Sequence, residues 1–233
     1  MTVKFAHCLF EQSGSFKRAF ENLGIPAKDY DIQNQFGCTD EVCDIFTQIE
    51  RAMYNKHSFF DSIDKDDLIM AFFPCTYFCE NNVMFFTGTN INYRNMKKSD
   101  VLDKIMYRAD LRHKMYMYLL KLCYVCEVRQ LRLIVENPYN PHHYLRYNFP
   151  YKPAVIDMNR RRSGDYYKKP TQFLFVNCLP AGKRSIQLDK PIKFISNQTI
   201  VNRSMISPDY AHNFICDHIL GIESGHTQPT LFE

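Results

Sequence analysis

The chain has 233 residues, of which 45% are hydrophobic and 23% charged, and this is the composition of an ordinary globular protein. Its formal net charge of +4 permits a nucleic-acid partner without requiring one. No apolar run is long enough to cross a bilayer, and the opening MTVKFAHCLF continues into polar sequence without a signal-peptide cleavage site. We therefore expect one domain over residues 1–233 in the cytoplasm, with no membrane partner and with its nine cysteines reduced.

The first part of the chain predicts alternating strands and helices. Residues 3–10 are apolar enough for a buried strand, and a tight turn follows them. The next helix is indicated by apolar residues at i, i+3, i+4 and i+7, namely Phe16, Ala19, Phe20 and Leu23, with Gly24 as its stop. A short strand is expected at residues 30–32, and a second helix carries one apolar face made of Val42, Ile45, Phe46, Ile49 and Met53.

The alternation continues to the end of the chain. Residues 68–73 form an apolar run that ends at Pro74, as expected for a strand buried on both faces of a parallel sheet. The polar stretch 80–98 has no sustained periodicity and predicts a mobile loop over the active cleft. The remaining predictions are a long helix at 99–128, strands at 131–135, 154–156 and 173–178, and a last helix at 209–220. This pattern predicts an α/β fold with a doubly wound, mostly parallel sheet.

Distinctive residues follow the predicted strands at the points where these strands end. They are Ser13-Gly14, Asp31, Pro74-Cys75 and Glu136-Asn137. Each of them alone has a structural explanation, such as a turn glycine, a cap or a buried thiol. In open α/β sheets, however, ligands bind outside the carboxyl ends of the strands, so four such coincidences together predict a site.

Several of these segments resemble motifs of the DNA cytosine-C5 methyltransferases. Pro74-Cys75-Thr76-Tyr77-Phe78-Cys79 is similar to the nucleophile motif of that family, Pro-Cys-Gln-x-Phe-Ser, and Glu136-Asn137-Pro138 resembles its Glu-Asn-Val. Residues 9–16 resemble the cofactor loop, Phe-x-Gly-x-Gly, and Asp31-Ile32 matches the acidic and apolar pair that holds the adenosine. Asp61 stands where the family has the carboxylate that meets the adenine amino group. The chain as a whole, including residues 169–173, resembles short methyltransferase-like proteins of bacteriophages and mobile elements.

The resemblance implies a fold of the S-adenosylmethionine-dependent methyltransferase type and a location in a bacterial or phage-infected host cell. Cys75 is then the thiolate that adds to C6 of cytosine, and Glu136 hydrogen-bonds the N3/N4 edge of the base. The cofactor is S-adenosylmethionine, and no metal is required. The residues expected to bind the cofactor are Phe10, Ser13, Gly14, Asp31, Ile32, Asp61 and Pro74.

DNA is the expected partner, and RNA stays open as a substrate. Basic residues that could neutralise phosphates near the flipped base are Arg160, Arg161, Arg162, Lys168 and Lys169, although a solvated basic face explains them equally well. Only roughly 20 to 25 residues separate Cys178 from Asn202-Arg203-Ser204, too few for the large target-recognition domain of bigger family members. A partner subunit that supplies sequence specificity is compatible with this length.

A second function remains open from the sequence. Gln12 and Thr76 stand where the family has glycine and glutamine. These differences favour a catalytically weak or inactive methyltransferase-fold protein that binds DNA or a bacterial defence protein.

Overall fold

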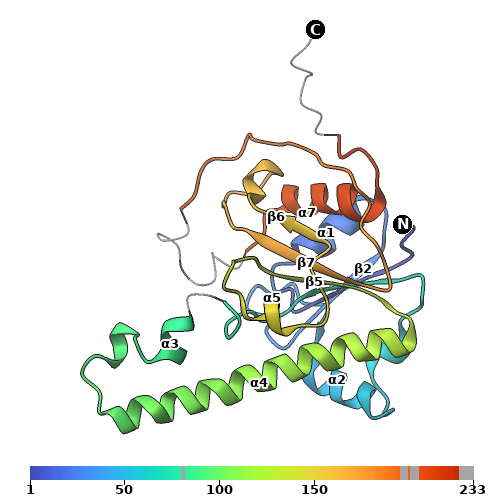
Figure 1. Ribbon diagram of the computed structural model, residues 1–233. Helices are drawn as coiled ribbons and strands as arrows, with labels where there is room; N and C mark the ends of the chain where they lie inside the picture. Colours follow the sequence, from blue (N-terminus) through green and yellow to red (C-terminus); the bar gives the residue numbers. More distant parts are fainter. Residues whose placement is uncertain (80–81, 195–198, 200–204, 226–233) are drawn as a thin grey trace.

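A computed structural model describes residues 1–79, 82–194, 199 and 205–225 of the chain (Figure 1). The described residues form one seven-stranded sheet in the order β3-β2-β1-β4-β5-β7-β6. The first five strands in this order run parallel, and β7 is antiparallel to both β5 and β6. The strands are β1 (Ala6–Leu9), β2 (Ala27–Asp31), β3 (Glu41–Val42), β4 (Leu68–Phe72), β5 (Arg132–Pro138), β6 (Val155–Asp157) and β7 (Thr171–Val176). The prediction of an α/β fold with a mostly parallel sheet is thereby confirmed.

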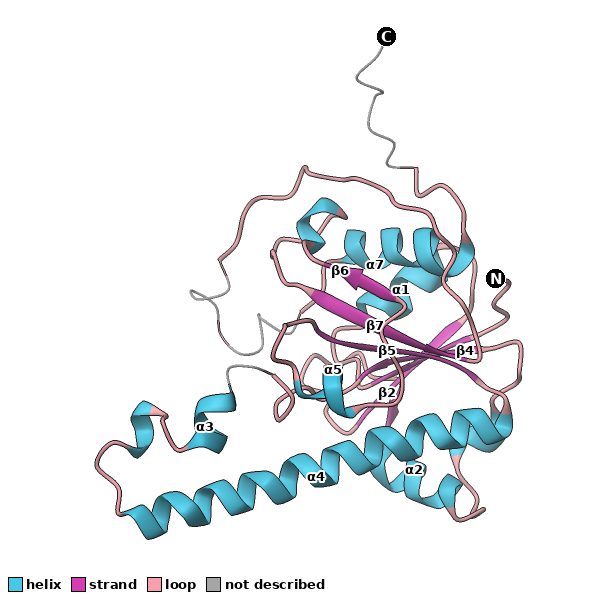
Figure 2. Cartoon of the chain, in the orientation of Figure 1, coloured by secondary structure: helices cyan, strands magenta, loops and turns pink. Residues whose placement is uncertain are grey.

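Helices cover both faces of the sheet (Figure 2). On one face lie α1 (Ser15–Asn22) and α7 (Pro208–Phe214), and the latter continues as the π-helix η6 (Ile215–Leu220). On the other face lie α2 (Ile45–Met53) and the long α4 (Lys98–Arg129). The shorter helical segments are η1 (Phe59–Ser62), α3 (Val83–Thr87), η3 (Ile91–Tyr93), α5 (Tyr144–Asn148) and η4 (Arg160–Arg162).

Alternation along the strands divides the apolar side chains between two cores. In β4, Ile69 and Ala71 belong to the core under α2 and α4, whereas Leu68 and Met70 belong to the core under α1 and α7. All four are fully buried, which explains why this strand is one continuous apolar run in the sequence. Burial of a large apolar side chain contributes about 1.5–3 kcal/mol, so the two cores hold the strand ends in fixed positions.

Two segments differ from the sequence-based predictions. Val42, expected on the second helix, lies in the short strand β3, because Asp44 caps the helix by accepting a hydrogen bond from the backbone N of Phe46 at 3.0 Å. The stretch predicted as a loop contains α3 and η3 within residues 82–98, with Tyr93 buried; residues 80 and 81 lie outside the described part. Helices of only three to five residues leave no periodicity in the sequence, which explains this miss.

None of the described helices combines the length and the apolar character needed to span a membrane. The longest, α4, carries charged side chains along its whole length.

Candidate active site

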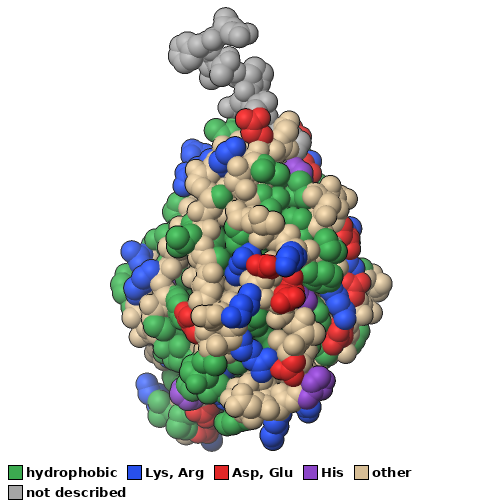
Figure 3. Space-filling view, turned by 90° about the vertical axis from the view of Figure 1, so that its right-hand side faces the viewer, with side chains coloured by type: hydrophobic (Ala, Val, Ile, Leu, Met, Phe, Trp, Pro, Cys, Tyr) green, Lys and Arg blue, Asp and Glu red, His purple; other side chains and the backbone are tan. Residues whose placement is uncertain are grey.

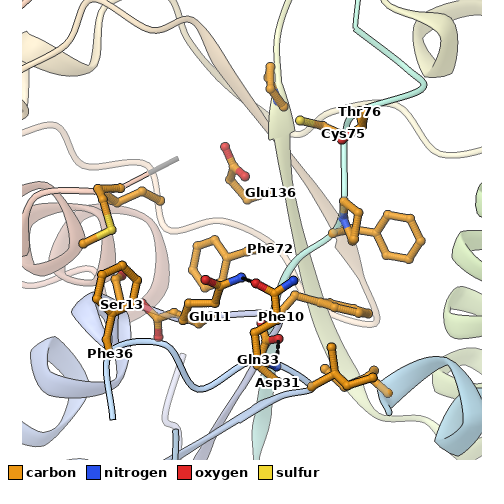
Figure 4. A pocket seen from close by; sticks show the side chains of 18 of the residues that line it. Phe10, Glu11, Ser13, Asp31, Gln33, Phe36, Phe72, Cys75, Thr76 and Glu136 are labelled. Atoms are coloured by element: carbon orange, nitrogen blue, oxygen red, sulfur yellow. Dashed lines mark hydrogen bonds between the residues drawn. The ribbon is translucent and has the colours of Figure 1, made fainter. Parts of the chain in front are cut away.

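A pocket opens at the carboxyl ends of the parallel strands β1, β2, β4 and β5 (Figure 4). Its cavity volume is about 510 Å³, within the usual range for a cofactor or small-molecule site. Eight of the predicted functional residues line it: Phe10, Ser13, Asp31, Ile32, Pro74, Cys75, Glu136 and Lys169. The motifs that are scattered in the sequence therefore meet at one edge of the sheet.

Cys75 and Glu136 lie toward one end of this pocket, and Asp31, Glu11 and Ser13 lie toward the other (Figure 4). Strand pairing explains why Cys75 and Glu136 are neighbours. Phe72 of β4 is the register partner of Glu136 in β5, and Cys75 follows Phe72 by only three residues. Only 7% of Glu136 is exposed, and its side-chain Oε1 atom has no hydrogen-bond partner among the described residues. A buried carboxylate oxygen without a partner is costly unless a ligand satisfies it.

The Cys75 thiol belongs to a pair with Cys79. The chain turns so that the backbone N of Cys79 donates to the Cys75 carbonyl at 3.2 Å, which brings both thiols to one side. A hydrogen bond from the Cys79 thiol lowers the pKa of Cys75, and the positive charge of Lys169 lowers it further, against the opposing effects of burial and of Glu136. The same hydrogen bond raises the pKa of Cys79. Cys75 is therefore the more acidic thiol of the pair.

Cys79→Ala should therefore raise the pKa of Cys75. Loss of the donor destabilises the thiolate, so alkylation of Cys75 by iodoacetamide should reach its half-maximal rate at a higher pH than in the native chain. Cys79→Ser keeps a donor and is the matched control, with a smaller displacement of the pH profile. An unchanged pH profile in the alanine variant would show that Cys79 does not influence the pKa of Cys75.

Asp31 ends β2 and is the carboxylate of the opposite part of the pocket. It is buried, and one of its oxygens accepts a hydrogen bond from the backbone N of Gln33 at 2.8 Å. Burial raises its pKa, and backbone hydrogen bonds oppose this effect only in part. The side chain is thus a hydrogen-bond acceptor at the lining of an open cavity, which suits a ligand with hydroxyl donors.

The loop between β1 and α1 is organised by Glu11, which the motif comparison did not single out. Its buried carboxylate accepts hydrogen bonds from the backbone N of Phe16 at 2.7 Å and of Lys17 at 3.1 Å, and so caps the first turn of α1. Burial raises its pKa to about 7. Gly14 has φ +60 at the N-cap of this helix, so it serves the turn, and the pocket is lined by Ser13 rather than by Gly14 itself. The sequence signal for Glu11 is a carboxylate four residues before the first residue of the helix.

Backbone strain in this loop lies at Phe10, which has φ +60 although it is not glycine. Its ring packs against Phe46 and Phe73, with ring centres 5.3 and 5.5 Å away, and this packing holds the conformation. Gln12, which stands where the related motif has glycine, is not among the residues with positive φ. Its side-chain amide instead donates to Gln33 Oε1 at 2.6 Å and accepts a hydrogen bond from Gln35.

Asp61 does not reach the pocket, contrary to the prediction that it binds the adenine. It belongs to η1, where its carboxylate accepts from the backbone N of Ser58 at 2.9 Å and pairs with Arg129 at 2.6 Å. These contacts hold its pKa at about 2. Because η1 precedes β4 and Arg129 ends the helix before β5, Asp61 lies toward the amino ends of the strands and has a capping role.

Arg160 was predicted to bind phosphate, but it is fully buried. Its guanidinium forms an ion pair with the equally buried Asp165 and lies 4.8 Å from the centre of the Tyr210 ring. It cannot reach a nucleic acid without unfolding this region. Arg162 and Lys168 are exposed and Arg161 is partly exposed, whereas Lys169 lines the pocket beside Cys75.

The described residues contain no group of three or more His, Cys, Asp or Glu side chains arranged to hold a metal ion. No protein-family model matches this chain, and a comparison with curated proteins finds no match either.

Proposed function

We propose that this protein is an S-adenosylmethionine-dependent cytosine-C5 methyltransferase that acts on DNA. The observation that carries the proposal is the pairing in one pocket of a thiol with a lowered pKa, Cys75, and a buried carboxylate with an unpartnered oxygen, Glu136. A thiolate and a carboxyl group are the two groups that addition to a cytosine ring requires. The sheet, with β7 antiparallel between β5 and β6, is compatible with the methyltransferase fold type that the motifs imply.

The chemistry begins at Cys75. Its thiolate would form a bond from Sγ to C6 of cytosine, which pushes electrons into the ring and makes C5 nucleophilic. Glu136 would stabilise the developing charge by hydrogen bonding at the N3/N4 edge. Once C5 has taken up the methyl group that the bound cofactor would supply, its proton would be lost to a base. The electrons of the C5–H bond would re-form the C5–C6 double bond, the S–C6 bond would break, and Cys75 would leave as a thiolate. The target base must leave the duplex stack to reach this thiol, at a cost of a few kcal/mol.

The opposite part of the pocket would hold the cofactor. S-adenosylmethionine supplies an electrophilic methyl group when bound. Asp31 would accept hydrogen bonds from the ribose hydroxyls, Phe10 and Ile32 would contact the apolar parts, and Ser13 would face the methionine part. The fit is supported by the buried acceptor at Asp31 and by a cavity of about 510 Å³.

Asp31→Asn should weaken binding of S-adenosylhomocysteine by about tenfold or more, because hydrogen bonds to a charged group contribute about 1.5–3 kcal/mol. Isothermal titration measures this. Asp66→Asn, at an exposed ion pair with Lys4, is the control and should bind like the native chain. Equal affinity in both variants would contradict the assignment of Asp31 to the cofactor.

Methylation itself is tested by bisulfite sequencing of DNA from cells that express the chain. Protected cytosines are expected. Unmodified DNA, together with a folded protein that binds the cofactor, would contradict the enzyme assignment.

The second candidate is a methyltransferase-fold protein that binds DNA or a partner protein without methylating. The observation that favours it is the Gln12–Gln33 hydrogen bond, which links two residues that line the pocket. Failure to bind S-adenosylhomocysteine at any concentration up to the millimolar range would favour this candidate over the enzyme.

A further inference from the structure

Residues 82–114 form an arm that extends from the body of the protein. The buried apolar contacts of α4 with the body come from its second half, where Leu119, Leu122 and Cys126 are buried. Between Leu102 and Tyr118 no side chain of α4 is fully buried. Residues 98–114 therefore project over about 25 Å, at about 1.5 Å per residue, with α3 packed beside them (Figure 1).

The free half of α4 lies on the same side of the molecule as the candidate active site. The helix ends at Arg129, and β5 starts three residues later, so α4 runs antiparallel to β5 with its last turn at the amino end of that strand. Its first half must then extend beyond the carboxyl ends of the strands, where the pocket opens. The structure confirms the proximity, because Arg112 lies 4.5 Å from the ring centre of Tyr144, whose backbone N donates to the carbonyl of Phe78 in the Cys75 turn at 3.0 Å.

The arm carries the excess positive charge of the protein. Between residues 82 and 114 there are seven Lys and Arg residues and three Asp residues, an excess equal to the net charge of +4 of the whole chain. The face of the molecule seen in Figure 3 instead mixes basic and acidic side chains. Net positive charge is thus concentrated on the projecting arm.

The positive charges on the arm are also ordered. Lys104, Arg108 and Arg112 recur every four residues and so share one face of α4, which we call the basic stripe. Asp103 and Asp110 lie on the other side of the helix. The stripe continues the face that is buried further along the helix, so it lies on the side of the helix toward the body. Within it, Lys104 is exposed and Arg108 and Arg112 are partly exposed.

Two aromatic rings of α3 hold the guanidinium groups of the stripe in place. Arg108 lies 4.0 Å from the ring centre of Phe85, and Arg112 lies 3.8 Å from that of Phe86. Neither Arg forms an ion pair with an acidic side chain among the described residues. Ordered guanidinium groups that are free of carboxylates are suited to phosphate, which they can bind through paired hydrogen bonds.

We propose that the basic stripe binds the phosphate backbone of duplex DNA beside the pocket. This inference rests on the proposed function for the position of the duplex: a base flipped onto Cys75 places the helix across the carboxyl edge of the sheet, alongside the arm. The length of about 25 Å matches most of one DNA turn, which is about 34 Å. The arm would hold the duplex independently of base sequence.

The test is the affinity of the full chain for a duplex of about 30 base pairs, measured by fluorescence anisotropy over a range of salt concentrations. The combined variant Lys104→Gln and Arg108→Gln should bind at least about tenfold more weakly at about 0.1 M salt, and its log–log salt slope should be shallower by about 2. Glutamine keeps the helix propensity, so α4 should be retained. The charge-preserving variant Lys104→Arg with Arg108→Lys and the off-stripe variant Lys114→Gln are the controls.

Binding by the combined variant that is no weaker than binding by Lys114→Gln would overturn the proposal. Tighter binding of single-stranded RNA than of duplex DNA by the native chain would also overturn it. Titration with S-adenosylhomocysteine separates this proposal from the proposed function, because the combined variant should bind the cofactor normally. A native chain that binds duplex DNA through the stripe but never methylates it would support the stripe and contradict the enzyme.

Discussion

Replacing Cys75 with Ser should lower methyl transfer by orders of magnitude. The serine hydroxyl has nearly the same volume, but its pKa is far too high for addition to C6 without a base. The hydrogen bond from Cys79 and the charge of Lys169 that favour a thiolate at residue 75 cannot compensate for that difference. The measurement is covalent trapping with S-adenosylmethionine present: native protein should form a denaturation-resistant adduct with 5-fluorocytosine DNA, because methylated C5 then has no proton to lose, and Cys75→Ser should form none.

Two controls show whether the loss is chemical. Cofactor affinity should survive in Cys75→Ser, because the cofactor contacts are assigned to the part of the pocket around Asp31 and Ser13. The urea midpoint should barely change, because the side chain is only partly buried. A structural cysteine would give the reverse result, with reduced stability and unchanged activity. If the native chain binds the cofactor but forms no adduct, the enzyme assignment must be abandoned.

The site could be predicted from the sequence to the extent that it depends on strand ends. Strands buried on both faces are apolar runs, as in β4 and the first part of β5, so the positions of Cys75 and Glu136 at the ends of two such runs predict that they meet. Asp31 ends the short strand β2, which carries charged residues. The assignment of Asp61 came from the family resemblance alone, and it is wrong because Asp61 follows no strand and its carboxylate caps η1. A match in residue type alone, with no strand end to position the side chain, was not enough to place Asp61 in the site.

Two features of the structure could not be predicted from local sequence patterns, because they depend on contacts between distant residues. The positive φ of Phe10 is held by packing of its ring against aromatic rings of α2 and of the segment after β4. The antiparallel insertion of β7 between β5 and β6 depends on pairing across the chain, as between Leu133 and Val176. Residues 80–98 predict a loop because helices of three to five residues leave no periodicity, whereas the helical part of the arm from residue 99 is predicted from the sequence.

Burial of Arg160, within the run Arg160-Arg161-Arg162, also depends on a contact that the local sequence does not indicate. Three consecutive arginines indicate a solvated basic patch, yet Arg160 is fully buried with Asp165. Asp165 also accepts hydrogen bonds from the backbone N of Tyr166 at 2.6 Å and of Tyr167 at 3.4 Å. The pair thus joins η4 to the segment that leads into β7.

Asp165→Asn should lower the free energy of unfolding by about 3–5 kcal/mol, because it leaves the Arg160 guanidinium buried without a counter-charge. Urea denaturation measures the loss. Arg160→Met combined with Asp165→Asn removes both charges and should recover part of it, since a buried pair replaced by neutral side chains costs much less than a broken one. Arg162→Gln, at an exposed position, should change stability by no more than about 0.5 kcal/mol. If Arg160→Met weakened DNA binding while stability stayed at the native value, Arg160 would be a phosphate ligand after all, and the buried ion pair would not describe the protein in solution.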